Sequence, residues 1–135
     1  MNPYSLLIIL LAVVSCTKQQ TAPTRLFDVS IGVIDLSREL MGNWEKVCFI
    51  TPYTNNDAVK QLLGFNFDVE NKSAISVLDS ITLVVTVNGN QVTEYFETPR
   101  HNIDFSSLQA KCFTKSNARF KIVRDENGWP NMQHS

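Results

Sequence analysis

The sequence predicts one small α+β domain, with an antiparallel sheet of four or five strands and two or three short helices. Its clearest β signal is the stretch 80–98, where apolar and polar residues alternate on both sides of an Asn-Gly-Asn turn, as in a β-hairpin. A second apolar strand, 44–53, is broken at Pro52 because proline has no N–H to donate to a ladder. Polar cap residues at 54–57 then precede a helical pattern that stops at Gly64.

Shorter patterns predict the other elements. They are a strand at 26–31, a helix at 35–41, an edge strand at 65–70, a helix at 104–113 and a last strand at 118–123. Because four short strands cannot bury both faces of a sheet alone, the helices that start near Asp35, Asn55 and Asp104 are expected to cover one side. The chain after Trp129-Pro130 is expected to end as a polar tail.

The first sixteen residues, MNPYSLLIILLAVVSC, have the shape of a secretory signal: a short apolar core followed by small residues before a cut. The apolar run 6–14 is far shorter than the roughly 20 residues that a transmembrane helix needs. An ordinary cleaved signal with an incidental Cys16, or a buried N-terminal strand, are the other interpretations. The segment lacks Lys and Arg, so only the α-amino group supplies the usual positive charge.

Val13-Val14-Ser15-Cys16 resembles the lipobox of bacterial lipoprotein precursors. The resemblance implies that residues 1–15 are removed and that Cys16 is diacylated and becomes the N-terminus. It also implies a periplasm-facing protein that is held in the bacterial cell envelope by lipid. Thr17 follows the cysteine where an inner-membrane lipoprotein of that family usually carries Asp, so the resemblance favours the outer membrane.

This organisation divides the chain into three parts. Residues 1–15 form the signal peptide, residues 16–24 a lipidated polar tether that contains Pro23, and residues 25–135 the globular domain. The domain is long enough to bury a real core. No apolar segment outside the leader is long enough to cross a membrane either, so the lipid alone is expected to attach the protein.

Charge gives no sign of a nucleic-acid partner. The chain carries 12 basic and 13 acidic residues, for a formal net charge of −1, and these charges are scattered along the sequence. A binding site for nucleic acid would need a basic field, which this pattern does not provide. The oligomeric state is not indicated by the sequence.

Cys48 and Cys112 remain once Cys16 is assigned to lipid. In an oxidising compartment we expect them to form a disulfide bond, the alternative being two buried thiols that never meet. Neither lies in a Cys-x-x-Cys motif, and no histidine is near either in sequence, so a redox or nucleophilic role is not indicated.

The segment that holds Cys48 has the pattern Trp-x3-Cys-x3-Pro-Tyr, from Trp44 to Tyr53. It resembles segments of small, uncharacterised bacterial envelope lipoproteins, and that resemblance implies no activity. Trp44 and Tyr53 are candidates for an exposed aromatic contact with a partner. The alternative, which such residues more often fulfil, is to close the edge of a core with the polar tip in water.

No catalytic, cofactor-binding or metal-binding residue is indicated. His101 and His134 show no ligand spacing, no Gly-x-Ser-x-Gly motif is present, and the few glycines form no phosphate loop. The nearest polar cluster is Arg100, His101 and Asp104, in a stretch expected to be a loop. We therefore expect a protein that is not an enzyme and needs no cofactor.

These observations favour a non-catalytic envelope protein that binds another macromolecule, such as an inhibitor, an immunity factor or an accessory factor of envelope assembly. The alternative is a periplasmic carrier of a small apolar or lipid ligand, which needs a cavity that no pattern reveals. A hydrolase of the cell wall is a third class, and would need clustered titratable groups in a cleft.

Overall fold

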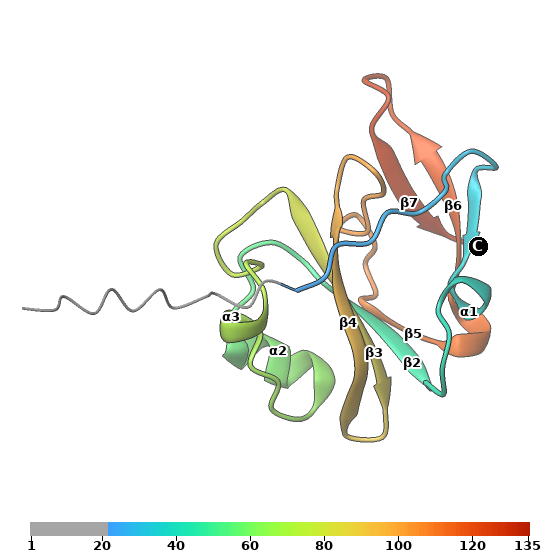
Figure 1. Cartoon of the computed structure of the whole chain (residues 1–135). Coiled ribbons are helices and arrows are strands. Elements are labelled where there is room, and N and C mark those ends of the chain that lie inside the picture. The colour runs from blue at the N-terminus through green and yellow to red at the C-terminus, as the bar shows by residue number, and fades with distance from the viewer. Residues whose placement is uncertain (1–21) are drawn as a thin grey trace, which may run out of the picture.

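A computed structural model describes residues 22–135 and shows two antiparallel sheets packed against each other, with short helices at the sides (Figure 1). The leader, the Val13-Val14-Ser15-Cys16 motif and most of the tether lie outside the described residues. The four-stranded sheet has the order β4-β3-β2-β5 and the three-stranded sheet the order β1-β6-β7. The α+β class and the single small domain are therefore confirmed in outline, but the strands are more numerous than predicted and form two sheets.

The elements follow one another in the order β1, α1, β2, α2, α3, β3, β4, β5, η1, β6 and β7. The strands are β1 (Val33–Asp35), β2 (Lys46–Ile50), β3 (Ile81–Asn88), β4 (Gln91–Pro99), β5 (Cys112–Thr114), β6 (Arg119–Arg124) and β7 (Pro130–His134). The helices are α1 (Leu36–Glu39), α2 (Asn56–Leu63), α3 (Val69–Lys72) and the 3-10 turn η1 (Lys115–Asn117).

The predicted β-hairpin is confirmed as β3 and β4, and the structure settles its turn. Asn88 faces Gln91, so the two-residue turn is Gly89-Asn90. Gly89 has a φ of 59°, and a positive φ at the first position of a two-residue hairpin turn favours glycine. The ladder shifts by one residue between Thr86 and Val87, which marks a β-bulge near the tip.

The predicted helix after Pro52 is also confirmed, with its caps. The Asn55 side chain accepts a hydrogen bond from the Ala58 N–H at 3.0 Å, and Gly64 ends α2 in the left-handed conformation with a φ of 82°. Val59 and Leu63 are its buried residues. They pack α2 against the four-stranded sheet.

Four predictions along the chain are wrong: two strands, one helix and the polar tail. Residues 26–31 form no strand: Phe27 bonds through both backbone groups to the side chain of Asn102. Residues 65–70 form no edge strand, because Asp68 accepts from the Asn71 N–H and begins α3. The predicted helix at 104–113 is a chain of turns that ends in β5, paired with β2. The polar tail is in fact β7, which pairs with β6.

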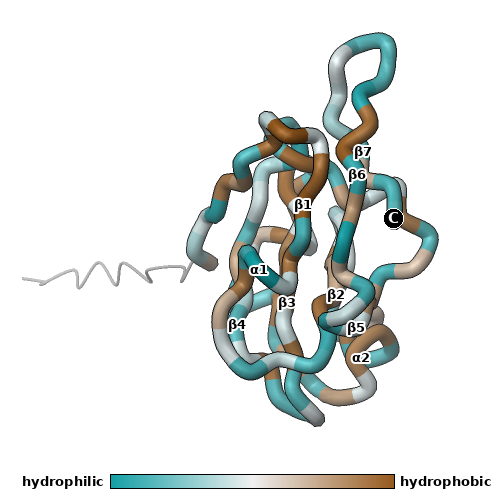
Figure 2. Tube along the Cα trace, turned by 90° about the vertical axis from the view of Figure 1, so that its right-hand side faces the viewer, coloured by the Kyte–Doolittle hydropathy of each residue, from teal (hydrophilic) through white to brown (hydrophobic). Residues whose placement is uncertain are grey.

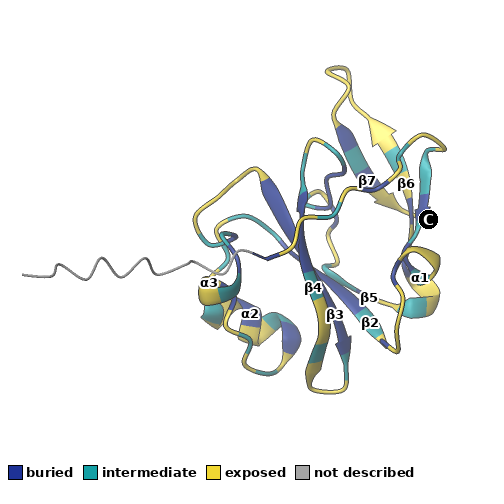
Figure 3. Cartoon of the chain, in the orientation of Figure 1, coloured by how far each residue is buried: buried dark blue, intermediate teal, exposed yellow. Residues whose placement is uncertain are grey.

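The core has two parts, one on each face of the four-stranded sheet. Between the two sheets lie large rings, among them Phe49, Phe105 and Phe120, which are fully buried. On the other face, Cys48, Val85 and their neighbours pack against α2 and α3. Figure 3 shows β3 buried along nearly its whole length, whereas the outer side of α2 is exposed. In Figure 2, hydrophilic residues are concentrated on loops such as the β6–β7 turn.

Candidate functional site

The disulfide bond predicted between Cys48 and Cys112 is present. The two residues face each other across the β2–β5 pair, with Cα atoms 4.1 Å apart and 64 residues apart in sequence. Phe49 N–H donates to the Lys111 carbonyl at 2.7 Å, so the cysteines occupy the adjacent, closer non-hydrogen-bonded pair. Cys48 is buried, and the bond fastens the short edge strand β5 to the sheet.

The two aromatic residues singled out as possible partner contacts occupy different environments. Trp44 is buried, with a 3% exposed fraction, and its indole N–H donates to the Leu40 carbonyl at 3.0 Å. The Lys115 ammonium lies 4.9 Å from its ring, which places Trp44 in the core beneath that lysine. Tyr53 is 65% exposed. Only Tyr53 of this pair therefore presents a surface to a partner.

Of the predicted polar cluster, the structure brings two members together and leaves the third outside. The Arg100 Nη2 donates to Asp104 Oδ2 at 3.0 Å, whereas His101 is exposed. Asp104 also accepts from the Trp129 indole N–H at 2.7 Å and the Ser106 N–H at 2.9 Å. Burial disfavours the charged carboxylate, but these hydrogen bonds outweigh it and hold the pKa of Asp104 below its usual value.

Asp104 therefore ties the loop after β4 to β7. Its backbone is bound there as well, because its N–H donates to the Pro130 carbonyl and its carbonyl accepts from the Met132 N–H. We call this link between the loop after β4 and the start of β7 the polar junction. Arg100, Ser106 and Trp129, which donate to the carboxylate, all lie in the two segments that it joins. Trp129 was not connected with the cluster in sequence, and no local signal links residues 25 positions apart.

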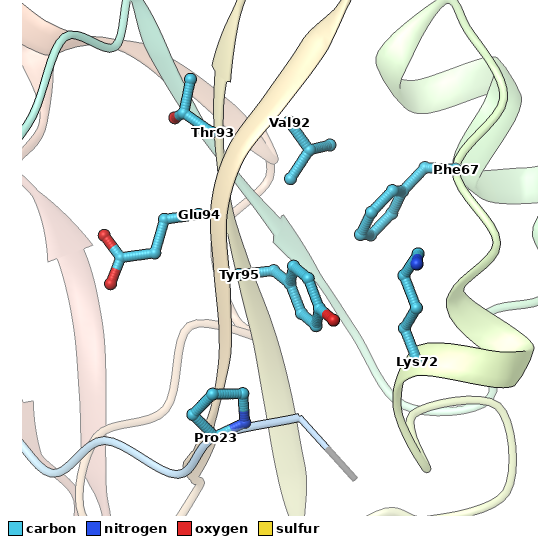
Figure 4. A pocket seen from close by; sticks show the side chains of 7 residues that line it. All are labelled: Pro23, Phe67, Lys72, Val92, Thr93, Glu94 and Tyr95. Carbon is cyan, nitrogen blue, oxygen red and sulfur yellow. The ribbon is translucent and has the colours of Figure 1, made fainter. Parts of the chain in front are cut away.

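A groove of about 460 Å³ lies between β4 and the segment around α3 (Figure 4). Phe67 and Tyr95 face each other across it, with ring centroids 5.4 Å apart and planes inclined by 69°. Val92 and Pro23 complete the same side, whereas Thr93 and Glu94 point to the other side of the strand in Figure 4. The groove thus holds two half-buried rings in a lining that is partly apolar and partly polar.

The electrostatic feature of this groove is Lys72, the last residue of α3. Its ammonium nitrogen lies 5.9 Å from the Phe67 centroid and 6.0 Å from the Tyr95 centroid, within cation–π range. None of the ion pairs within residues 22–135 involves Lys72. The groove therefore combines aromatic surface with one lysine ammonium, and the acidic Glu94 also belongs to its lining.

The fold positions this groove at an edge of the four-stranded sheet. Glu97 of β4 accepts through its side chain from the Ser73 hydroxyl at 2.7 Å and the Ala74 N–H at 3.1 Å, which fixes the chain that leaves α3. Its backbone pairs with the N-terminal segment, where Thr24 lies parallel to Glu97. That parallel pairing cannot continue in the usual way, because Pro23 has no N–H to donate. No residue of this groove was singled out from the sequence, where Phe67 belonged to a predicted strand.

The described chain offers no metal centre: within residues 22–135, no group of three or more His, Cys, Asp or Glu side chains is placed to hold an ion. None of the helices in that part of the chain is long and apolar enough to cross a membrane. Comparisons of the sequence and the structure with known protein families, with curated proteins and with solved structures found no match.

Proposed function

We propose that this chain is a lipid-anchored protein of the bacterial envelope that binds another protein, without catalysis, through the groove between β4 and α3. The observation that carries the proposal is the groove itself: the Phe67 and Tyr95 rings are left partly exposed beside the ammonium of Lys72. Aromatic side chains are enriched at the centres of protein interfaces, and a cation beside them can pair with an acidic group at the rim. Cys16 would supply the lipid anchor, as the leader predicts.

Packing between the sheets supports a protein partner over a carried lipid. The Phe49 and Phe105 rings stack with centroids 4.1 Å apart, and Phe120 meets both edge-on. Rings in contact leave the middle of the sandwich filled with side chains. A carrier needs an apolar cavity in such a place. The groove, in contrast, is a surface feature that a protein can cover.

The polar junction likewise supports a non-catalytic role. The Asp104 carboxylate is 2% exposed and is held by Arg100, Ser106 and Trp129. A general base must reach a proton on a substrate. An enclosed carboxylate with its acceptor sites engaged by the protein serves the fold, as its links to β7 indicate.

A photo-crosslinking experiment tests the binding site. The lipidated protein in its native envelope would carry p-benzoylphenylalanine in place of Val92, in the groove, or in place of Val123, an exposed apolar residue of β6. We expect one discrete protein adduct from the Val92 position and none of that size from the Val123 position. Lys72→Glu should abolish the adduct, because it reverses the charge over the rings.

The matched charge control is Lys60→Glu, on the exposed side of α2, which should leave the adduct intact. Equal adducts from positions 92 and 123, or an adduct that survives Lys72→Glu, would contradict the groove as the binding site. An adduct of twice the chain's own mass would identify the partner as a second copy.

A further inference from the structure

Two loops at one end of the four-stranded sheet carry exposed apolar side chains. Tyr53, after β2, is 65% exposed, and Val77 and Leu78, before β3, are 70% and 42% exposed. The loops are joined because the Tyr53 N–H donates to the Ile75 carbonyl at 2.8 Å. We call these three side chains the loop patch. Apolar side chains gathered at adjoining loops commonly mark a contact surface.

Tyr53 is held outward by an unusual backbone. Its φ of 62° is the only positive φ of a non-glycine residue in the described chain. Bulky residues rarely adopt this left-handed region, and where they do the surrounding structure enforces it. Here the enforced conformation leaves an aromatic ring in solvent, so the fold gains no buried contact from it.

The N-terminal segment reaches the domain beside the loop patch. The Glu97 N–H donates to the Pro23 carbonyl at 2.7 Å, while the Glu97 carboxylate accepts from the Ala74 N–H, three residues before Val77. Ala22 itself is buried in the same core as Ile75. Figure 1 shows the start of the described chain next to α3 and the loop that follows it.

The length of chain outside the structure limits how far this end can lie from the lipid. From Cys16 to Ala22 the backbone spans at most about 20 Å even when fully extended. Ala22 is buried on the domain, so the length of the tether is counted from this residue. If Cys16 is acylated, the end of the domain with the loop patch is therefore held close to the membrane, because Ala22 lies within about 20 Å of the lipid.

We propose that the loop patch rests on the bilayer in which the lipid of Cys16 is inserted; this inference depends on the anchoring part of the proposed function. A tyrosine with an apolar ring and a polar hydroxyl suits the boundary between headgroups and acyl chains. The side chains of Val77 and Leu78 would enter the bilayer beside the Tyr53 ring. The neighbouring charges are mixed, with Asp57 and Asp79 as well as Lys72, so apolar contact carries the interaction and anionic lipid is not required.

This orientation leaves the groove usable. Pro23 lines its end nearest the bilayer, and Val92 lies next to the β3–β4 turn at the other end. A protein partner would therefore reach the Phe67 and Tyr95 rings from the side of the hairpin tip. The tether and the loop patch together would fix which way the groove faces, which a flexible tether alone would not do.

Fluorescence in vesicles tests the inference. The lipidated full chain would be reconstituted in vesicles of phosphatidylethanolamine and phosphatidylglycerol as Tyr53→Trp and, separately, as Met41→Trp. Met41 is 82% exposed and comes shortly after α1, and Figure 1 shows α1 on the opposite side of the molecule from α3. The emission of the native Trp44 and Trp129 is measured on the parent protein and subtracted from that of each variant. We expect nitroxide-labelled lipid to quench the added Tyr53→Trp emission several-fold more strongly than that of Met41→Trp, and aqueous iodide to show the reverse order.

Val77→Ser combined with Leu78→Ser should weaken the lipid quenching of Tyr53→Trp, because it removes the two apolar neighbours. Iodide quenching of Tyr53→Trp equal to that of Met41→Trp, in protein whose N-terminal peptide has the mass of an acylated Cys16, would overturn the orientation. A peptide without acyl mass would instead refute the anchoring itself. Protection of Tyr53→Trp in detergent, with a doubled molecular mass, would show that a second copy covers the loop patch and would likewise overturn the proposal.

Discussion

The two faces of the four-stranded sheet are covered in different ways. One face packs against a second sheet, whose strand β1 precedes β2 in the chain while β6 and β7 follow β5. The other face is covered by α2 and α3, which lie between β2 and β3 in sequence. Large rings fill the first core, whereas aliphatic side chains and the disulfide bond dominate the second.

The difference concerns how far apart in sequence the packed residues are. On the helical face, a strand, a turn and a capped helix follow in direct succession from Lys46 to Leu63. On the sandwich face, Ile34 of β1 pairs with Phe120 of β6, and Phe49 stacks on Phe105. Closing such long loops costs conformational entropy before any contact forms. We therefore expect the free energy of unfolding to depend more on each large side chain of the sandwich face than on those of the helical face.

The largest expected effect is on the sandwich face. Phe49 is fully buried and meets the rings of Phe105, Phe113 and Phe120. Phe49→Ala should lower the free energy of unfolding by about 5 kcal/mol, because it leaves a cavity among three rings that cannot all collapse into it. Urea unfolding followed by far-ultraviolet circular dichroism measures the change.

Val59→Ala is the corresponding truncation on the helical face, with a smaller side chain. Val59 is also fully buried, and its truncation should cost about 2 kcal/mol because the removed volume is smaller. If Phe49→Ala does not fold, Phe49→Leu, with an expected loss of about 1.5 kcal/mol, measures the same site. Equal losses for Phe49→Ala and Val59→Ala would show that the two faces do not differ as proposed.

The next effect concerns the disulfide bond, which belongs to the helical core but holds a strand that both cores share. Cys112 packs against the helical core, while the next residue, Phe113, is part of the sandwich core. Closing a loop of 64 residues is worth about 4 kcal/mol on the chain-entropy account. Reduction should therefore lower the urea midpoint of unfolding, and Cys48→Ala combined with Cys112→Ala should do the same. Alkylation would first show that both thiols are free. A urea midpoint of unfolding that is then unchanged would contradict the stabilising role of the disulfide bond.

The same contrast explains what could be predicted from the sequence. The β3–β4 hairpin and α2 were predicted correctly, because the Gly89-Asn90 turn and the Asn55 and Gly64 caps act within a few residues. The pattern at 104–113 was misinterpreted as a helix because Phe105, Leu108, Cys112 and Phe113 recur at spacings of three, four and one. That spacing arises instead from turns that place each ring between the sheets, a position fixed by β5 pairing with β2 and by Asp104 binding β7.

The candidate site was less predictable than the fold. Its groove joins Pro23, Phe67, Lys72 and Tyr95, which come from three separate parts of the chain and share no motif. Phe67 alternated with polar neighbours as in a strand, yet the Asp68 cap turns the chain into α3. Trp44 and Tyr53 lie in one motif, and only the fold separates the buried ring from the exposed one. Pairing of cysteines, in contrast, followed from their number and the expected compartment.

The smallest effect sharpens the comparison at the polar edge of the sandwich face, where Asp104 links the loop after β4 to Trp129. The hydrogen bonds that lower the pKa of Asp104 below the unfolded value stabilise the fold above the unfolded pKa, and that stability is lost as the pH falls through the lowered pKa. Asp104→Asn should therefore cost about 2 kcal/mol near neutral pH, and its difference from the parent should shrink in strong acid. Glu126→Gln, on the exposed β6–β7 turn, controls for the loss of one negative charge and should leave the acid dependence unchanged. A difference between Asp104→Asn and the parent that stays constant down to strongly acidic pH would show that the charge of Asp104 does not hold this junction together, and that the strands alone position Trp129.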